Sequence, residues 1–91
     1  MIYTIKPSSR FQKDVKLAQK RGYRIELLTQ TIKLLAEGSA LPERYKNHAL
    51  SGNYAGCYEC HILPDWLLVY EKDDDTLFLY LTRTGSHSDL F

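Results

Sequence analysis

The sequence lacks the features that mark secreted, membrane-spanning and disulfide-rich proteins. It has only two cysteines among 91 residues, which is too few for a disulfide framework. It has no apolar stretch long enough to cross a bilayer, and residues 1–6 lack the basic and then apolar layout of a signal peptide. Internal repeats and low-complexity tracts are also missing. We therefore expect residues 1–91 to form a single cytoplasmic domain without a membrane partner.

The two cysteines, Cys57 and Cys60, have a Cys-x-x-Cys spacing but do not indicate a redox or metal site. Both fall in a segment with the pattern of a β-strand, where residues three apart point to opposite faces. A redox motif of this spacing opens a helix, and no helix is predicted after it. We expect two free thiols that are buried or half-buried.

The chain has a net charge of only +1, but its charges are unevenly distributed. Residues 1–50 hold ten Lys and Arg against four Asp and Glu, whereas residues 51–91 hold two against seven. Near the N-terminus, Asp14 is the one acidic residue among Lys6, Arg10, Lys13, Lys16, Lys20, Arg21 and Arg24. Such a cluster suits a polyanion, because neutralising phosphates releases counterions. A solvated helix face would carry the same pattern.

The first half of the sequence predicts a short strand and two amphipathic helices. Ile2–Lys6 is rich in β-forming residues, and Pro7 ends it. Ser8-Ser9 suits the N-cap of a helix that ends at Gly22, and Gly38 ends a second helix. Apolar residues recur at helical spacing in both, at Phe11, Val15 and Ala18 and then at Ile25, Leu28, Ile32 and Leu35.

The second half predicts a sheet. After an irregular loop at residues 39–53, three β-like runs span Tyr54–His61, Trp66–Glu71 and Leu77–Thr82. Short turns at Pro64-Asp65 and Asp73-Asp74-Asp75 separate them and favour antiparallel pairing. The predicted fold class is α+β, with an N-terminal strand and a two-helix hairpin packed on a three-stranded antiparallel meander.

This topology brings titratable, cationic and aromatic side chains to one end of the meander. The end of its first strand, its first turn and the end of its third strand lie at the same edge. The residues predicted to meet there are His61, Asp65, Trp66, Arg83 and His87. His48 lies in the long loop, and the topology does not place it.

These residue types suit the cleavage of an RNA strand by its own 2′-hydroxyl group. The reaction needs a base for that hydroxyl and an acid for the leaving 5′-oxygen, and histidine suits both tasks. Arginine matches phosphate oxygens, and an aromatic ring offers a surface for an unstacked base. Each residue also has a structural interpretation, such as a turn for Asp65 or the core for Trp66. Zinc binding is disfavoured, because no pair of histidines has the close spacing of a structural zinc site.

Several motifs together are similar to those of one toxin family. They are His48-Ala49-Leu50-Ser51-Gly52, His61 with Pro64-Asp65-Trp66, Arg83-Thr84-Gly85-Ser86-His87, the final Leu90-Phe91, and the stretch Lys13–Arg21. In this combination the sequence resembles the YafQ branch of the RelE/ParE toxin superfamily over essentially its whole length. The resemblance implies a microbial-RNase-like fold, with two helices on an antiparallel sheet that the first strand joins.

The resemblance also implies a function and a set of partners. The protein would be the toxin of a type II toxin–antitoxin system, an endoribonuclease that cleaves translated mRNA on the ribosome without a metal or other cofactor. Its antitoxin would be of the DinJ or RelB kind, and operator DNA would be contacted only through the antitoxin complex.

The site residues that the resemblance implies fall into two groups. The catalytic group is His48, His61, Asp65 and His87. The supporting or RNA-contacting group is Trp66, Arg83 and Phe91, to which the charge pattern adds Lys13, Lys16 and Lys20. In this interpretation His87 is the acid, Asp65 or His48 is the base, and His61 orients or stabilises. A helical turn at Ser88-Asp89-Leu90 would place His87 and Phe91 on one face, with Leu90 inward.

Two other functions remain open. A ParE-like toxin that binds gyrase would have the same fold, although such toxins do not carry the three-histidine set. A decayed toxin would retain only antitoxin binding. The segment Cys57–Cys60, with Glu59, and the run Asp73–Asp75 are more acidic than the family pattern, which leaves codon preference open.

Overall fold

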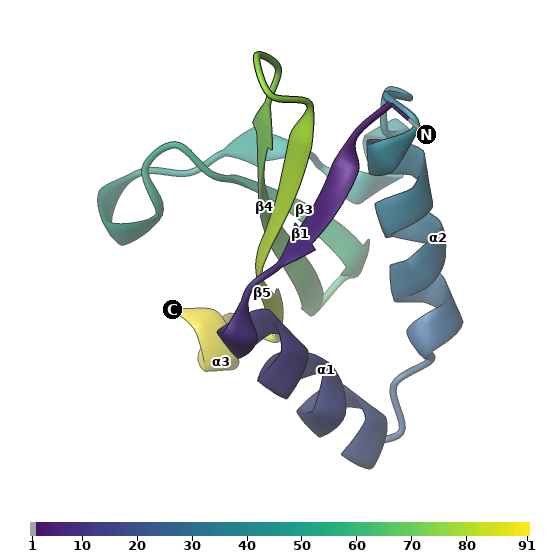
Figure 1. Ribbon diagram of the computed structural model, residues 1–91. Helices are drawn as coiled ribbons and strands as arrows, with labels where there is room; N and C mark the ends of the chain where they lie inside the picture. Colours follow the sequence, from purple (N-terminus) through teal and green to yellow (C-terminus); the bar gives the residue numbers. More distant parts are fainter. Residues whose placement is uncertain (1) are drawn as a thin grey trace.

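The computed structural model describes residues 2–91 and contains a five-stranded mixed sheet with two helices on one face (Figure 1). The strands lie in the order β1-β5-β4-β3-β2. Their bounds are Thr4–Pro7 for β1, His48–Ala49 for β2, Tyr58–Leu63 for β3, Trp66–Asp73 for β4 and Phe78–Gly85 for β5. The helices are α1 at Ser9–Lys20, α2 at Ile25–Ala36 and α3 at His87–Leu90, with 3₁₀ turns η1 at Glu43–Tyr45 and η2 at Gly52–Tyr54.

The meander formed by β3, β4 and β5 is antiparallel, as the turn signals predict. Two expectations about the strands are corrected. The first strand pairs parallel with β5, so the sheet is mixed, because the helices α1 and α2 carry the chain back across it. The run predicted from Tyr54 begins as a strand only at Tyr58, since Gly52–Tyr54 forms the turn η2.

Helix α1 begins, and both α1 and α2 end, where the sequence predicts. The Ser8 hydroxyl accepts a hydrogen bond from the Phe11 backbone N–H at 3.0 Å and caps α1. Gly22 and Gly38 follow the helices with φ of 79° and 76°, in the left-handed region that glycine tolerates best. None of the helices within residues 2–91 has the length and apolar character that a membrane span requires.

Apolar side chains form one cluster on each face of the sheet. The larger cluster lies under α1 and α2 and includes Phe11, Leu28, Leu35 and Leu79. The smaller cluster lies on the other face, where the end of the chain and the segment around η2 cover Leu67 and Val69 (Figure 1). A sheet that is covered on both faces explains why β4 is apolar at five successive positions, Trp66–Tyr70.

The cysteines are free and face opposite sides of the sheet, as predicted. Cys60 packs under the helices and Cys57 packs in the smaller cluster, although Cys57 lies one residue before β3. Burial raises the pKa of the Cys60 thiol to about 12, which makes it a poor nucleophile.

Candidate active site

Three histidines from different elements lie in a row on one rim of the protein. His48 is on β2, His61 is on β3 and His87 opens α3. The ring centroids of His48 and His61 are 6.4 Å apart, and those of His61 and His87 are 5.8 Å apart. The convergence of His61 with His87 confirms the edge predicted from the meander, and the structure adds His48 to it.

The placement of His48 corrects the expectation of an irregular loop. The segment at residues 39–53 contains the two-residue strand β2, in which His48 pairs with Glu59 of β3. Lys46, two residues before His48, has a φ of 47°, and its carbonyl oxygen lies 2.7 Å from Nδ1 of His48. Since a carbonyl oxygen only accepts, Nδ1 of His48 carries a proton, and Nε2 is the ring nitrogen that faces Glu59.

Asp65 lies directly against His87. Its Oδ1 accepts the backbone N–H of His87 at 3.0 Å and the Nδ1–H of the ring at 2.9 Å. The backbone hydrogen bond, followed by the one from the ring, lowers the pKa of Asp65. Both side chains are more than half exposed, at 68% for Asp65 and 54% for His87, so Nε2 of His87 is open to a substrate.

A buried carboxylate joins the other two histidines. Oε2 of Glu59 lies 2.9 Å from Nε2 of His48 and 3.8 Å from Nε2 of His61. Glu59 is only 4% exposed, and its Oε1 is buried without a hydrogen-bond partner. A buried carboxylate with an unpaired oxygen lowers the stability of the fold, and such groups are found most often at catalytic and binding sites.

Trp66 and Arg83 occupy positions that differ from those expected of RNA-contacting residues. Trp66 is 2% exposed, packs its edge on Tyr23 and donates a 2.9 Å hydrogen bond to the Thr84 hydroxyl, so no base can stack on it in this conformation. Arg83 donates to Asp14 on α1 through Nε at 2.7 Å and Nη2 at 3.1 Å. Trp66 is therefore part of the core and the Arg83 guanidinium is engaged by α1, so the prediction that both side chains meet the histidines at the edge is corrected.

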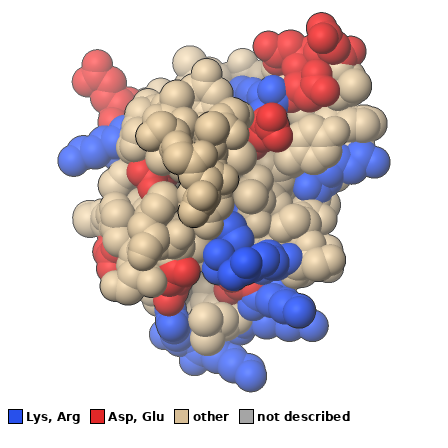
Figure 2. All heavy atoms as spheres, turned by 90° about the vertical axis from the view of Figure 1, so that its left-hand side faces the viewer, with Lys and Arg blue, Asp and Glu red and all other residues tan. Residues whose placement is uncertain are grey.

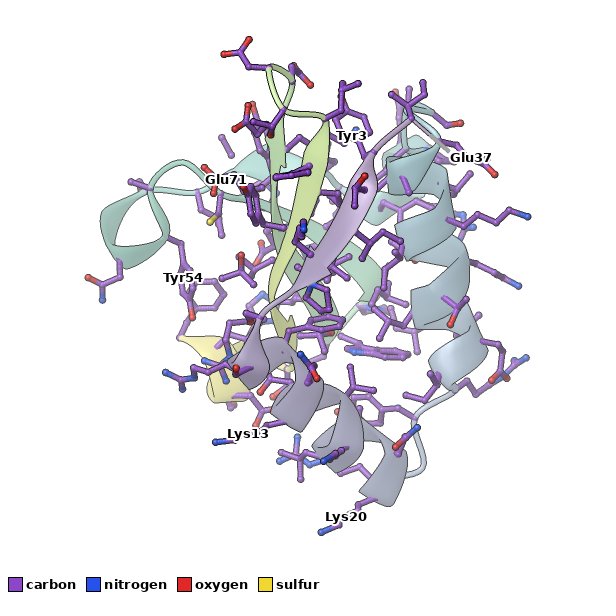
Figure 3. The ribbon with its side chains drawn as sticks, viewed as in Figure 1. Tyr3, Lys13, Lys20, Glu37, Tyr54 and Glu71 are labelled. Atoms are coloured by element: carbon purple, nitrogen blue, oxygen red, sulfur yellow. The ribbon has the colours of Figure 1, made fainter. Side chains whose placement is uncertain are left out.

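The C-terminal turn has the predicted form. Leu90 is buried in the smaller cluster, and the rings of His87 and Phe91 lie on the same side with centroids 6.4 Å apart. Phe91 is 61% exposed and also meets the edge of Tyr54, whose ring lies beside the end of the chain in Figure 3. An exposed aromatic ring thus extends the row of histidines.

The basic residues of α1 form a separate exposed surface. Lys13, Lys16 and Lys20 are all exposed, and Lys13 and Lys20 point away from the helix into solvent in Figure 3. Figure 2 shows Lys and Arg gathered at the lower end of one face, where α1 lies, and Asp and Glu at the top, where β4 turns into β5. The uneven charge of the sequence is therefore also a separation in space.

Comparison with known proteins identifies the family. The family model described as "Bacterial toxin of type II toxin-antitoxin system, YafQ" matches residues 3–91. The chain belongs to the YafQ family. It is 41% identical to the mRNA interferase toxin YafQ of Escherichia coli K12 over 88 residues, which cover 96% of this chain and 94% of that protein.

Two solved structures are similar to this YafQ-family chain. The toxin in a crystal structure of the E. coli DinJ–YafQ toxin–antitoxin complex matches with a TM-score of 0.89 and 39% identity, covering 100% of this chain and 99% of that one. A metal-bound toxin from Helicobacter pylori matches with a TM-score of 0.91 and 42% identity, covering 98% and 99%. Within residues 2–91 of the present chain, no group of three or more His, Cys, Asp or Glu is arranged to hold a metal ion.

The structure of this YafQ-family chain also contains site residues that the sequence did not predict. Glu59 is one, because its contact with His48 depends on the pairing of β2 with β3. Arg21 and Asp89 are a second case. The Arg21 guanidinium on α1 donates to both carboxylate oxygens of Asp89 on α3, at 2.6 and 3.3 Å. Asp89 also completes a capping box with Ser86, so this ion pair anchors the turn that carries His87.

This ion pair predicts a pH-dependent contribution to stability. Arg21, with the Ser86 backbone N–H, lowers the pKa of Asp89 from 3.8 to about 2. A lowered carboxyl pKa stabilises the fold above the unfolded-state value, and the contribution disappears as the pH falls through the folded-state value. We expect Asp89→Asn to melt a few degrees below the wild-type protein at pH 6, since a partly exposed ion pair contributes about 0.2–1 kcal/mol. The difference in melting temperature between the wild-type protein and Asp89→Asn is expected to disappear between about pH 4 and pH 2.

Glu37→Gln is the matched control for this measurement. Glu37 is an exposed carboxylate next to the end of α2, and within residues 2–91 it takes part in none of the ion pairs between Lys or Arg and a carboxylate. Its melting temperature is expected to follow the wild-type value at every pH. A gap for Asp89→Asn that persists unchanged to pH 2 would contradict the assignment.

Proposed function

We propose that the protein is an mRNA interferase, the toxin of a type II toxin–antitoxin system, which cuts translated mRNA on the ribosome. The row of His48, His61 and His87, with a carboxylate against each end, is the observation that carries the proposal. In this proposal the groups at the two ends of the row transfer protons, and the third histidine lies between them. In-line attack by a 2′-hydroxyl needs this arrangement, because the attacking and leaving oxygens lie on opposite sides of phosphorus.

His87 is the acid in this proposal. Its Nδ1–H is held by Asp65, so a protonated ring presents Nε2–H to the leaving 5′-oxygen. The negative charge of Asp65 stabilises the imidazolium form and fixes the ring. Asp65 itself is a weak candidate for the base, because its two hydrogen bonds from His87 lower its pKa.

The His48–Glu59 pair is the base. Nδ1 of His48 is occupied by the Lys46 carbonyl, so the pair takes up a proton on the side where Nε2 and Oε2 approach to 2.9 Å. A proton removed from the 2′-hydroxyl is held between these two acceptors. His61 lies between acid and base, where its ring stabilises the charge of the phosphate.

The proposal extends to location and partners. The substrate places the protein in the cytoplasm with the ribosomes. A cognate antitoxin of the DinJ or RelB kind neutralises it, as supported by the likeness to the toxin of the E. coli DinJ–YafQ complex. Operator DNA is contacted only through that complex.

Inducing the protein in a bacterial host and mapping mRNA 5′ ends tests the proposal. New ends within translated codons, absent when translation initiation is blocked, are the expected result. DNA damage without new ends would instead indicate a ParE-like gyrase poison, and neither effect would indicate a decayed toxin. The three-histidine row favours the enzyme over both alternatives.

Removal of Phe91 alone is expected to slow cleavage by about ten- to a hundredfold. Stacking of a base on an aromatic ring contributes about 1–3 kcal/mol, and this ring is exposed beside His87. Single-turnover cleavage on programmed ribosomes measures the effect. Leu77→Ala, which removes another exposed apolar side chain at a distant turn, is the control. Full activity of the truncated protein would show that the terminal ring is passive.

Replacing Lys13, Lys16 and Lys20 together with glutamine is expected to weaken ribosome binding and flatten its salt dependence. The log–log slope against salt is expected to fall by somewhat less than one unit for each phosphate that the variant no longer neutralises. Binding at several salt concentrations gives the slope. An unchanged slope would mean that this face of α1 is only solvated.

A further inference from the structure

A groove opens beside the row of histidines, on the side of His61 and the turn η1. It has a volume of about 340 Å³ and is lined by Arg44, Lys46, His61, Ile62, Leu63 and Pro64. This volume is near the lower end of the range of about 300–1,000 Å³ for ligand pockets. Because His61 belongs both to this groove and to the row, the groove is continuous with the candidate active site.

Neither cation of the groove has an acidic partner among the described residues, and Arg44 is also held in place. The Arg44 guanidinium lies over the ring of Tyr45, 4.4 Å from its centroid, and donates to its hydroxyl at 3.1 Å. Tyr45 is 3% exposed, so it is a rigid support. In the part of the chain that the structure describes, the ion pairs made by Lys or Arg use Arg21, Arg24 and Arg83, and neither cation of the groove takes part.

The backbone of Lys46 contacts His48, the proposed general base. Its left-handed conformation, with φ of 47°, closes η1 through a 2.9 Å hydrogen bond from its N–H to the Glu43 carbonyl. The same turn directs its own carbonyl to His48 at 2.7 Å. The Cα of Lys46 is therefore fixed two residues from His48, the proposed general base, while the Lys46 side chain is exposed.

The groove is also lined by apolar residues, of which Leu63 and Pro64 are exposed. The pairing of β3 with β4 shifts register between His61 and Leu63, as in a β-bulge. Ile62 stays buried, whereas Leu63 is 47% exposed and adjoins the exposed Pro64. A groove lined by both cations and apolar side chains matches one nucleotide of a single strand, which has a phosphate on one side and a flat base on the other.

We propose that this groove is a nucleotide subsite that binds the residue adjacent to the cleaved bond in single-stranded RNA. Arg44 and Lys46 bind its phosphate, and its base lies against Leu63 and Pro64. The subsite rests on the proposed function, because it positions the same strand that His48 and His87 cut. The subsite binds the RNA strand and sets which phosphodiester bond lies at the histidines, but it takes no part in proton transfer.

The test uses Arg44→Gln/Lys46→Gln, which removes both charges and leaves the Lys46 backbone intact. Lys33→Gln/Lys72→Gln is the matched control, because it removes two charges from α2 and β4 at residues that do not line the groove. The probe is a 2′-O-methyl RNA hexanucleotide, which cannot be cleaved, titrated into the ¹⁵N-labelled full-length protein. We expect amide shifts at Lys46, Ile62 and Leu63 and a roughly tenfold rise in Kd for the groove variant but not for the control. The salt slope is expected to fall by about 0.7 for each phosphate that is no longer neutralised.

Cleavage of ribosome-bound mRNA is measured on the same proteins. The groove variant is expected to need about tenfold more substrate at an unchanged maximal rate, because the missing interaction is equally strong in the ground and transition states. Equal RNA affinity for the two variants, or shifts that avoid the groove, would overturn the subsite. So would a weaker antitoxin affinity with unchanged RNA affinity, which would assign the groove to an acidic protein segment. A wild-type protein that binds the hexanucleotide in the groove but does not cleave mRNA would refute the proposed function and leave the subsite standing.

Discussion

Replacing His87 with alanine is expected to slow mRNA cleavage by about 10²–10⁴-fold, the usual contribution of a positioned acid. The melting temperature is expected to change little, because the side chain is 54% exposed and substitutions at such positions stay within about 0.5 kcal/mol. Single-turnover cleavage and thermal unfolding of the same preparation provide the two measurements. Ser88→Ala, on the same turn and also exposed, is the control and is expected to retain activity.

The hydrogen bond between Asp65 and His87 adds a prediction about the two residues together. Asp65→Asn is expected to slow cleavage by about tenfold or more, because the ring loses the charge that stabilises its protonated form. Since Asp65 acts through His87, the double variant His87→Ala/Asp65→Asn is expected to be no slower than His87→Ala alone. Additive losses would show that Asp65 has a separate role, such as the base.

Glu59→Gln is expected to separate activity from stability. Cleavage is expected to fall by about 10²-fold, because a neutral amide cannot share the proton taken up by His48. The free energy of unfolding is expected to change by less than about 1 kcal/mol, since the substitution also removes a buried charge whose Oε1 has no partner. Urea unfolding followed by fluorescence of the single tryptophan measures the second quantity.

Glu71→Gln provides the control for Glu59→Gln, because Glu71 is an exposed carboxylate on the neighbouring strand β4. It is expected to leave cleavage unchanged. If Glu59→Gln were as active as the wild-type protein, the His48–Glu59 pair would not be the base. If it unfolded, the carboxylate would be a structural requirement instead.

Local signals in the sequence predicted the two helices and the order and pairing of the meander strands, although not all strand bounds. Ser8 caps α1, and the apolar spacing of Phe11 and Leu28 places these residues in the core. Such features depend on neighbours within a few residues, so they can be predicted without knowledge of the fold. The convergence of His61, Asp65 and His87 was also predictable, because antiparallel strands with short turns have few possible arrangements.

The environment of individual side chains was not predictable in the same way. Arg83 is engaged by Asp14, 69 residues earlier in the chain, and Trp66 is covered by Tyr23. A strand of two residues, β2, leaves no periodic signal, yet it places His48 on Glu59. These contacts depend on how α1 and the segment after it pack on the sheet, and on the pairing of β2 with β3.

The sequence by itself determined the two helices, the meander, the residue types at the rim and the separation of basic and acidic halves. It did so through caps, periodicity and composition, which act over a few residues. Only the tertiary structure decided that His48 meets a buried Glu59, that Asp65 orients His87, and that Arg21 anchors the turn bearing it. Each of these pairs joins distant parts of the chain, and a contact of that kind exists only when packing of the sheet and helices brings its two partners within hydrogen-bonding distance.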